Sequence, residues 1–532
     1  MHESGRDFQR SSQRHSLVKV RLRRYRFLTL GLLSSALVGA QPGRPPGPHC
    51  ADPSGAVLPP LPPMERQLAP LATAPVLTAT KAAGPSCGAS LRPQPTPLVI
   101  RLTHQDGIPD SRSDGAAVTA NGLTVQFRAG ATVTRGTVAL RLAPELTYEQ
   151  NVGFETSPGG DASRSPLASP FYVGAQSADL PSRFGVRPRR IAVHLGESGL
   201  WWRPAAATLG MSAGQVPWGP HAGEGLVIGH SAPGVLRLEG ALRGSGRLRS
   251  VQLRSFGGVV VESPYFDADR TNDQRRLSGV RLEWAAPSSP LRIGVSRTLM
   301  DGRRAPRWHE TLTAALRRPT TDSVIDFTSI DAEWHDPARG SWGWLELARQ
   351  VPITSIGDLL RHPTEGLALR LGGSQTIVAG PAAAWIVSAE FVRLDQPQQR
   401  TDRPEQDLYT SATVVHGWTH RGQPLGSGLG PGGQRQLLGI DRVGRQLRVG
   451  GFLERARWND GMVYRQFLTG PFRHDVSIVG GVHVARSDDP DRWSVRLGVG
   501  RRLNYLFQNA QFNPGFRTAD LPLLRLHLTL TP

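Results

Sequence analysis

Residues 524–530 read Leu-Arg-Leu-His-Leu-Thr-Leu, a strict alternation of apolar and polar side chains. The same period of two recurs in 123–128, 138–142, 251–254, 280–284 and 493–499. Successive side chains of a β-strand point to opposite faces, so each stretch predicts a strand with one apolar and one polar face. In the final stretch we expect Leu524, Leu526, Leu528 and Leu530 to face lipid, and Arg525, His527 and Thr529 to face a lumen.

The polar faces of these strands carry Arg, Gln, Glu and His, and not only Ser and Thr. Antiparallel strands with one apolar face occur in soluble sandwiches and propellers, in solenoids and in transmembrane barrels. The sequence has no fixed repeat of about 20–50 residues, which argues against propellers and solenoids. A barrel in lipid must close, because no strand edge can go unpaired there. The sequence therefore predicts an all-β fold, a transmembrane antiparallel β-barrel over residues 98–532. At ~24 residues per strand with its turns, that length holds about 18 strands.

Composition excludes several other classes of protein. The chain has 532 residues, of which 39% are hydrophobic, and a mean hydropathy of −0.29. That is too polar for a bundle of membrane-spanning helices, each of which needs ~20 apolar residues. The 16 Phe, 12 Trp and 7 Tyr argue against wholesale disorder. Two cysteines exclude a disulfide scaffold and a Cys-rich metal site.

The first 40 residues are predicted to be a secretory signal peptide. Four arginines between positions 21 and 26 precede a short apolar run at 27–40, which ends in the small residues Val-Gly-Ala. A basic region, a short apolar run and a small-residue cleavage pattern define such a signal. A membrane anchor or a short buried helix is the alternative interpretation of the same run.

Residues 41–97 are predicted to be a disordered, Pro-rich linker. The segment is rich in Pro, Ala and Gly and holds too little apolar surface to form a core. Cys50 and Cys87 both lie in it, and an oxidising compartment permits them to pair with each other. That pairing stays open at this point.

Two further patterns concern helices and aromatic residues. Helical periodicity is rare, with one stretch near 353–362 and a weak one within 104–120. Several tryptophans lie near the ends of expected strands, where the interfacial girdle of a barrel would place them, although ordinary core aromatics fit the same positions. These tryptophans are Trp202, Trp284, Trp334, Trp344 and Trp385.

Two segments rich in Gly and Trp are more distinctive than the strand pattern. Residues 213–220 read Ala-Gly-Gln-Val-Pro-Trp-Gly-Pro and continue to Leu-Val-Ile-Gly-His-Ser-Ala-Pro at 226–233. Residues 416–426 read His-Gly-Trp-Thr-His-Arg-Gly-Gln-Pro-Leu-Gly, followed by Gly-Pro-Gly-Gly at 430–433. With the Arg-rich alternating strands after Leu437, these segments resemble the capsule assembly family named for Wzi, over roughly 100–532.

The resemblance implies a fold, a location and a function. It implies an outer-membrane β-barrel of a Gram-negative envelope, exported through the periplasm, in which short helical plug elements fill part of the lumen. It also implies a lectin-like protein that anchors capsular polysaccharide at the cell surface.

Candidate site residues come from the same two segments. Glycine beside tryptophan weakens a strand. Such pairs, here Trp218 with Gly219 and Gly417 with Trp418, are expected where the backbone must approach another strand or a ligand closely. We expect both segments to turn inward at the lumen. The candidate residues, either as clamps of the plug or as contacts of a polysaccharide, are Trp218, His416, Trp418 and Arg421.

No catalytic, cofactor or metal site is predicted. His416 and His420 stand four apart, which on a helix would suit a metal, but the flanking glycines favour strand and turn, where four residues span ~13 Å. The Gly-His-Ser-Ala-Pro sequence at 229–233 lacks the second glycine of a nucleophile elbow.

Three functions remain open from the sequence. The first is an outer-membrane barrel that binds, anchors or assembles a surface polysaccharide without catalysis. The second is a porin-like channel for anionic or sugar solutes, with arginines as its filter. The third is a secreted β-rich lectin or hydrolase.

The charge of the chain bears on its partners. Its 62 Lys+Arg exceed its 43 Asp+Glu, for a net charge of +19, and nearly all the basic residues are Arg. Arg suits the phosphates of lipopolysaccharide and the carboxylates of saccharides, although a genomic preference for Arg explains the excess equally well. The expected partners are outer-membrane lipid and lipopolysaccharide, capsular or other surface polysaccharide, and the barrel-insertion machinery. Nucleic acid is not expected, because exported proteins rarely meet it.

Overall fold

The computed structural model describes residues 93–531 apart from several gaps, which are 111–113, 157–163, 217, 221–223, 286–288, 303–323, 351–355, 362, 381–382, 396–406, 467–472, 488–491 and 509–519. All of these residues belong to the second of two compact units, Asp52–Pro532. The signal peptide predicted at 1–40 and nearly all of the linker predicted at 41–97 lie outside the described residues. The first strand begins at Gln94, so the last four residues of the predicted linker belong to the sheet.

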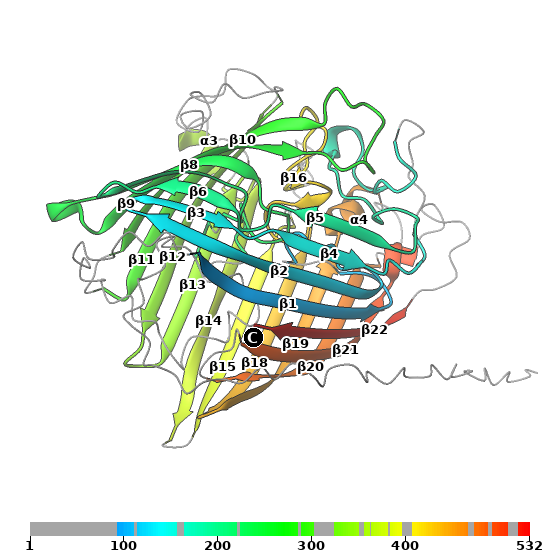
Figure 1. Ribbon diagram of the computed structural model, residues 1–532. Coiled ribbons are helices and arrows are strands. Elements are labelled where there is room, and N and C mark those ends of the chain that lie inside the picture. The colour runs from blue at the N-terminus through cyan, green and yellow to red at the C-terminus, as the bar shows by residue number, and fades with distance from the viewer. Residues whose placement is uncertain are drawn as a thin grey trace, which may run out of the picture. The chain divides into compact units, whose positions relative to one another are not determined.

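Antiparallel strands make up more than half of the described residues (Figure 1). They are β1 (Gln94–Asp106), β2 (Gly122–Arg135), β3 (Val138–Leu142), β4 (Glu145–Glu149), β5 (Arg190–His194), β6 (Gly199–Trp202), β7 (Ala207–Ser212), β8 (Leu236–Arg243), β9 (Val251–Val261), β10 (Gln274–Ala285), β11 (Leu291–Asp301), β12 (Val324–Asp336), β13 (Ser341–Arg349), β14 (Leu367–Ala379), β15 (Ala383–Arg393), β18 (Gln434–Gly444), β19 (Leu447–Trp458), β20 (Asp475–Arg486), β21 (Trp493–Leu503) and β22 (Leu521–Leu530).

The strands close into a barrel, because β22 pairs with β1 as well as with β21. β3 and β4 lie one after the other along β2, and β5 and β6 continue each other in the same way beside them. The 20 hydrogen-bonded segments of the sheet therefore build a wall of 18 strands in the described part of the chain. The predicted fold class and strand number are confirmed.

The connections between strands differ at the two ends of the barrel. At one end they are short, such as residues 136–137 between β2 and β3 and 445–446 between β18 and β19. At the other end they are long, including 150–189, 213–235 and 394–433. In bacterial outer-membrane barrels the short turns face the periplasm and the longer loops face outward. We call the two ends the short-turn end and the long-loop end.

The two faces of the wall differ in chemistry, as the alternation predicts. Leu282, Val295 and Ile330 lie side by side on β10, β11 and β12, and all three are exposed on the outer face. Arg281, one residue from Leu282, is buried on the inner face. An apolar outside and a polar inside are the chemistry of an outer-membrane barrel.

The last strand follows the same rule. Leu524 and Leu526 are exposed, and Leu528 and Leu530 are half-buried. Arg525 and His527 form hydrogen bonds with residues inside the barrel, and Thr529 is buried. The predicted alternation of this strand is confirmed, and contact of its leucines with lipid stays a prediction.

Four of the five tryptophans expected in a girdle are exposed near the short-turn ends of their strands. Trp202 is the last residue of β6, Trp284 and Trp334 are close to the ends of β10 and β12, and Trp385 is near the start of β15. Trp344 differs, because its place in the alternation of β13 points it inward, where it is buried. A ring of outward tryptophans at one level is typical of a membrane–water interface.

Helices contribute little to the described residues. α3 (Ile356–Arg361) lies in the stretch at 353–362 where a helix was expected, and α4 (Asp460–Gln466) follows β19. Short 3-10 turns are η1 (Gly174–Gln176), η2 (Gly246–Leu248) and η3 (Tyr505–Gln508). Residues 104–106 lie in β1, so the weak helical expectation for 104–120 is wrong there. None of the described helices is long and apolar enough to cross a membrane.

Two of the long connections fold back into the barrel, and we call them the plug: residues 213–235 and 407–433. The plug is irregular chain with one small hairpin, β16 (Thr419–His420) and β17 (Gln423–Pro424), so the helical plug expected from the resemblance is mainly a loop plug in the described residues. Plug residues such as Leu226 and Trp418 share one apolar core with inner-face residues of the wall such as Phe256, Met300 and Phe327. The core therefore lies between the plug and the long-loop half of the wall.

Candidate functional site

The two plug segments bind each other through the predicted tryptophan. Trp418 is completely buried, and its indole Nε1–H donates a hydrogen bond of 2.8 Å to the carbonyl of Val227. Its ring centroid lies 4.9 Å from that of Phe327 on β12. Tyr409 adds a second link, because its hydroxyl donates to the carbonyl of Leu226 at 2.5 Å. Trp418 thus joins both plug segments to the wall.

Trp218 occupies the other plug segment and is also buried. Its ring packs edge to face on Phe256 of β9, with centroids 5.1 Å apart. A Cβ at Gly279 would overlap the indole, so glycine at that position leaves room for the ring. The backbone beside it is held as well, because the Glu346 carboxylate of β13 accepts the Leu226 N–H with both oxygens at 3.0 Å.

These contacts match the clamping alternative stated from the sequence. A direct saccharide contact by Trp218 or Trp418 stays a prediction, and their burial leaves little surface for one. The expectation that both segments turn into the lumen agrees with the structure.

The two histidines of the second plug segment are buried and neutral. Burial, followed by the charge of Arg275, lowers the pKa of His416 to about 3. Burial, followed by Arg421, lowers the pKa of His420 to about 3. His420 Nδ1 accepts the backbone N–H of Val261 at 2.9 Å. His416 Nδ1 lies 3.5 Å from the hydroxyl of Thr419. Within the described ranges, no three His, Cys, Asp or Glu side chains are placed to hold a metal ion.

Arg421, the fourth predicted residue, lies apart from the plug core. Its side chain is exposed, and its backbone has a φ of +54°, a conformation that a side chain rarely adopts. Its N–H donates to the carbonyl of Val261 at 2.7 Å, and its guanidinium Nη1 lies 3.4 Å from His194 Nδ1 on β5. Arg421 therefore connects the plug to two separate strands of the wall.

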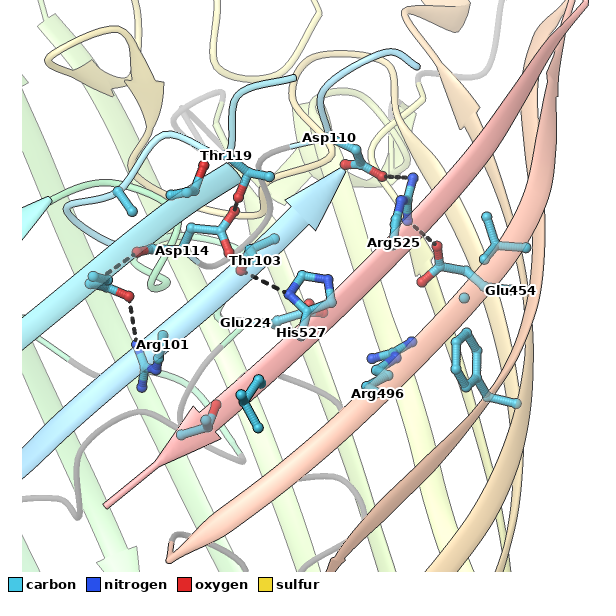
Figure 2. Close-up of a pocket in the computed structure, with 18 of the residues that line it drawn as sticks. Arg101, Thr103, Asp110, Asp114, Thr119, Glu224, Glu454, Arg496, Arg525 and His527 are labelled. Carbon is cyan, nitrogen blue, oxygen red and sulfur yellow. Dashed lines mark hydrogen bonds and ion pairs between the residues drawn. The ribbon is translucent and has the colours of Figure 1, made fainter. Parts of the chain in front are cut away.

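Charged side chains fill one side of the lumen below the connection at 107–121 (Figure 2). Arg525 lies between Asp110 and Glu454, with 3.6 Å to the Glu454 carboxylate. His527 Nδ1 lies 3.2 Å from the Thr103 hydroxyl. The cavity left here is small, about 100 Å³. These side chains bind mainly to one another, so we interpret the pocket as a set of contacts that holds the connection at 107–121 against the wall.

A larger cavity of about 330 Å³ opens under the plug toward the short-turn end, and we call it the tryptophan–arginine pocket. Its lining includes Trp201 and, as basic residues, Arg141, Arg203, Arg237, Arg243 and Arg254, against the acidic Glu197 and Glu239. The lining is therefore rich in positive charge. Trp218 and His230 of the plug also line it.

Trp201 has a fixed position on the wall of this pocket. A Cβ at Gly199 or Gly210 would overlap its indole, so the two glycines let the ring lie against the sheet. Trp201 Nε1–H donates to Glu239 at 2.6 Å, and the Glu239 carboxylate is paired with Arg237 at 2.8 Å. The Arg203 guanidinium lies 5.5 Å from the ring centroid. A half-buried aromatic ring beside arginines is suited to stacking on a sugar that carries an acidic group.

Sequence reasoning missed this pocket, although a signal was present. Leu200, Trp201 and Trp202 are consecutive on β6, and the period of two turns Trp201 inward if Trp202 faces lipid. The arginines come from three strands, β3, β8 and β9, and from the turn after β6, and no regular spacing along the chain relates them.

Comparisons with known proteins identify no family for this chain. A scan against protein families finds no match, and no curated protein matches the chain. Among solved structures the chain is similar to Wzi, described as an outer-membrane protein involved in group 1 capsule assembly in Escherichia coli and as a carbohydrate-binding β-barrel. The identity is 12%, with 82% of this chain and 84% of that chain covered and a TM-score of 0.49.

Porins are similar to the chain in the same way. A BenF-like porin from Pseudomonas fluorescens Pf-5 is 11% identical over 83% of this chain and 99% of that chain, with a TM-score of 0.39. OpdK of Pseudomonas aeruginosa, solved with vanillate, is 11% identical over 82% and 97%, with a TM-score of 0.42. Membership of the Wzi family therefore stays a prediction. Carbohydrate binding and transport are properties of those proteins, and the likenesses carry no argument about this one.

Proposed function

We propose that the protein is an outer-membrane β-barrel that binds an acidic surface polysaccharide, such as a capsular one, and takes part in its anchoring or assembly without catalysis. The tryptophan–arginine pocket carries this proposal. An aromatic ring held against the wall supplies a stacking surface for a sugar ring, and the arginines supply bidentate donors for carboxylates.

Placement in the outer membrane is supported by the wall itself. The outer face is apolar, and its exposed tryptophans gather near the short-turn ends. Because short turns face the periplasm in bacterial barrels, the tryptophan–arginine pocket opens to the periplasmic side. We therefore expect the polymer to enter the pocket from the periplasm.

The plug favours binding over transport. It shares a continuous core with wall residues from β9 to β19, including Phe256 and Trp458, and so extends across the long-loop half of the lumen. A channel remains the second candidate, since the pocket arginines would equally attract small anions, and a further cavity of about 430 Å³ lies beside the plug.

The test is a binding titration on the purified protein in detergent. Alginate, a polymer of uronic acids, and uncharged dextran of matched length serve as probes, with calorimetry as the readout. We expect alginate to bind and dextran to bind much more weakly. Trp201→Ala should weaken alginate binding about 10- to 100-fold, which corresponds to ~1.4–2.8 kcal/mol.

The neighbouring residue provides a matched control. Trp202→Ala removes the same side chain from the outer face of the same strand and should leave the affinity unchanged. Equal losses in both variants, or equal binding of alginate and dextran, would refute the pocket. Steady ion conductance of the wild-type protein in a planar bilayer, blocked by small anions, would favour the channel instead.

A further inference from the structure

One side of the barrel wall is incomplete in its long-loop half. β7 ends at Ser212, and the chain leaves the wall as the plug before returning at Leu236, where β8 begins. β5 pairs with β4 along one edge, and its other edge pairs with no strand among the described residues. β9 runs two residues past its last partner on β8, from Val259 to Val261. We call the space between the free edge of β5 and the end of β9 the notch.

The β16–β17 hairpin of the plug lies against the notch from inside. In the view of Figure 1, β16 is drawn between β5 and β10, and it contacts β9. The carbonyl of Val261 accepts the N–H of Arg421, and the N–H of Val261 donates to His420 Nδ1. Plug residues thus satisfy the end of β9, whereas the side chain of Arg421 crosses to His194 on β5.

A cavity of about 430 Å³ occupies this place. Its lining includes Val193 and His194 on the β5 side, Val259 and Val261 on the β9 side, and Arg421 between them. The outer rim is strongly apolar, because Ile191, Val193, Leu195 and Leu236 are 69%, 71%, 58% and 50% exposed. The cavity therefore joins an apolar rim on the membrane side to polar groups inside.

The cavity lining holds charges of both signs, but its carboxylates have partners other than Arg421: Glu145 accepts from Gln126, and Glu197 lies 3.7 Å from Arg128. Arg421 is exposed and has no carboxylate partner among the residues that the structure describes; His194 is its side-chain neighbour. Arg190, at the start of β5, is paired with Glu149 at 2.6 Å but acts on Arg421 as a nearby positive charge. A guanidinium in a membrane wall without an anion is costly. Arg421 is therefore the basic group at the notch that no described carboxylate neutralises.

The level of the notch identifies where an anion for Arg421 would come from. β5 and β6 together run from Arg190 to Trp202, which lies among the outward tryptophans near the short-turn ends. At ~3.3 Å per residue and a strand tilt of ~40°, this length crosses the ~25 Å apolar band and places Arg190 at the opposite interface. The Arg421 guanidinium, beside His194 four residues further along β5, lies just inside that interface. Lipid headgroups lie at that depth, in the outer leaflet.

We propose that the notch is a binding site for an outer-leaflet glycolipid with a phosphorylated headgroup, whose phosphate pairs with Arg421 and whose acyl chains lie on the apolar rim. The proposal rests on the outer-membrane placement proposed above and not on polysaccharide binding. Bidentate contact between guanidinium and phosphate supplies the specificity, and the apolar rim supplies the affinity for a lipid over a soluble anion.

Native mass spectrometry of the intact protein in detergent tests the proposal. The probes are bisphosphorylated lipid A, the same lipid without phosphates, and inorganic phosphate as a competitor. We expect one lipid A to bind with preference over its dephosphorylated form. Arg421→Gln should weaken lipid A binding at least tenfold, and Arg421→Lys should weaken it less because the charge is kept.

A control arginine is available at the other end of the barrel. Arg339 is 79% exposed in the short turn between β12 and β13, so Arg339→Gln should leave lipid binding unchanged. Heat-modifiability on a gel shows whether each variant is folded. If Arg421→Gln fails to fold, Leu236→Glu on the apolar rim tests the same site and should also reduce lipid binding.

Three results would overturn the site. They are unchanged binding in folded Arg421→Gln, equal binding of the dephosphorylated lipid, and displacement by millimolar inorganic phosphate, which would show a site for a free anion. Failure of the polysaccharide proposal leaves these measurements unaffected, because they do not involve Trp201. A protein that fractionates away from the outer membrane would instead contradict the placement on which both proposals depend.

Discussion

Trp418→Ala should loosen the plug without dissolving the barrel. The side chain is fully buried, packs on Phe327 and donates the hydrogen bond that holds Val227. Replacing a buried tryptophan by alanine costs ~3–5 kcal/mol, and part of that cost is the unpaired carbonyl of Val227. The wall strands keep their own hydrogen bonds, so the loss falls on the contact between the two plug segments.

Hydrogen exchange resolves this effect by position. A loss of ~3–5 kcal/mol in local stability raises the exchange rate of protected plug amides by about 10²- to 5 × 10³-fold when exchange is limited by opening. We expect that increase in peptides from 213–235 and 407–433. Peptides from β20 and β21, which contribute no described residue to the core around Trp418, should change little.

Trp202→Ala is the control, since it deletes an exposed tryptophan of the outer face. Unchanged exchange of the plug in Trp418→Ala would show that the plug is held by other contacts and would refute the clamp. An equal increase in plug and wall would show that Trp418 supports the whole barrel. A loss of alginate binding with an unchanged plug would move Trp418 from the clamp to the ligand site.

Two further predictions concern charge. Glu262, just after β9, has its pKa raised to about 9 by burial and by Asp179, Asp267 and Asp273, against Arg275. Because the folded-state pKa exceeds the unfolded one, its stabilising contribution is full at low pH and is lost as pH rises toward 9. His416 and His420 are neutral in both states above pH ~7.5, so they do not contribute in this range. The melting temperature in detergent should fall from pH 7.5 to 9 in wild type and fall less in Glu262→Gln, and equal falls in the two proteins would contradict this. Leu526→Arg should lower the free energy of unfolding by ~2–4 kcal/mol if the residue lies near the bilayer midplane. Urea titration in lipid vesicles measures this loss, with Leu526→Ala as the control. An unchanged free energy of unfolding would show that this face lies outside the lipid.

The wall was predictable from sequence because its information is local. The period of two in 524–530 predicts which side chains face lipid, and the same pattern can be read in each strand without knowledge of the others. Closure then follows from the rule that lipid tolerates no free edge. The alternation along each strand also predicts which tryptophans face outward. Trp344 was wrongly expected in the girdle because only its place near a strand end was considered, and not whether the alternation points it inward or outward.

The site was less predictable because its contacts span the chain. Trp418 and Val227 are 191 residues apart, and Arg421 and His194 are 227 apart. Glycine beside tryptophan indicated an inward segment at Trp218 and Trp418, but it did not distinguish a clamp from a ligand contact. The plug's lack of helix was equally hidden, because irregular chain held by buried side chains leaves no periodic signal.

The plug and the notch have one structural origin. β7 and β8 are shorter than β9, and shorter than β5 and β6 taken together, because the chain leaves the wall at Ser212 to build the first plug segment. The wall strand that is missing above Ser212 would have covered the free edge of β5, so filling the lumen opens the side of the barrel. Arg421, carried by the second plug segment, then lies in the opening. The same departure of the chain therefore creates two separate surfaces: the tryptophan–arginine pocket under the plug toward the short-turn end, and the notch with its apolar rim at the long-loop end.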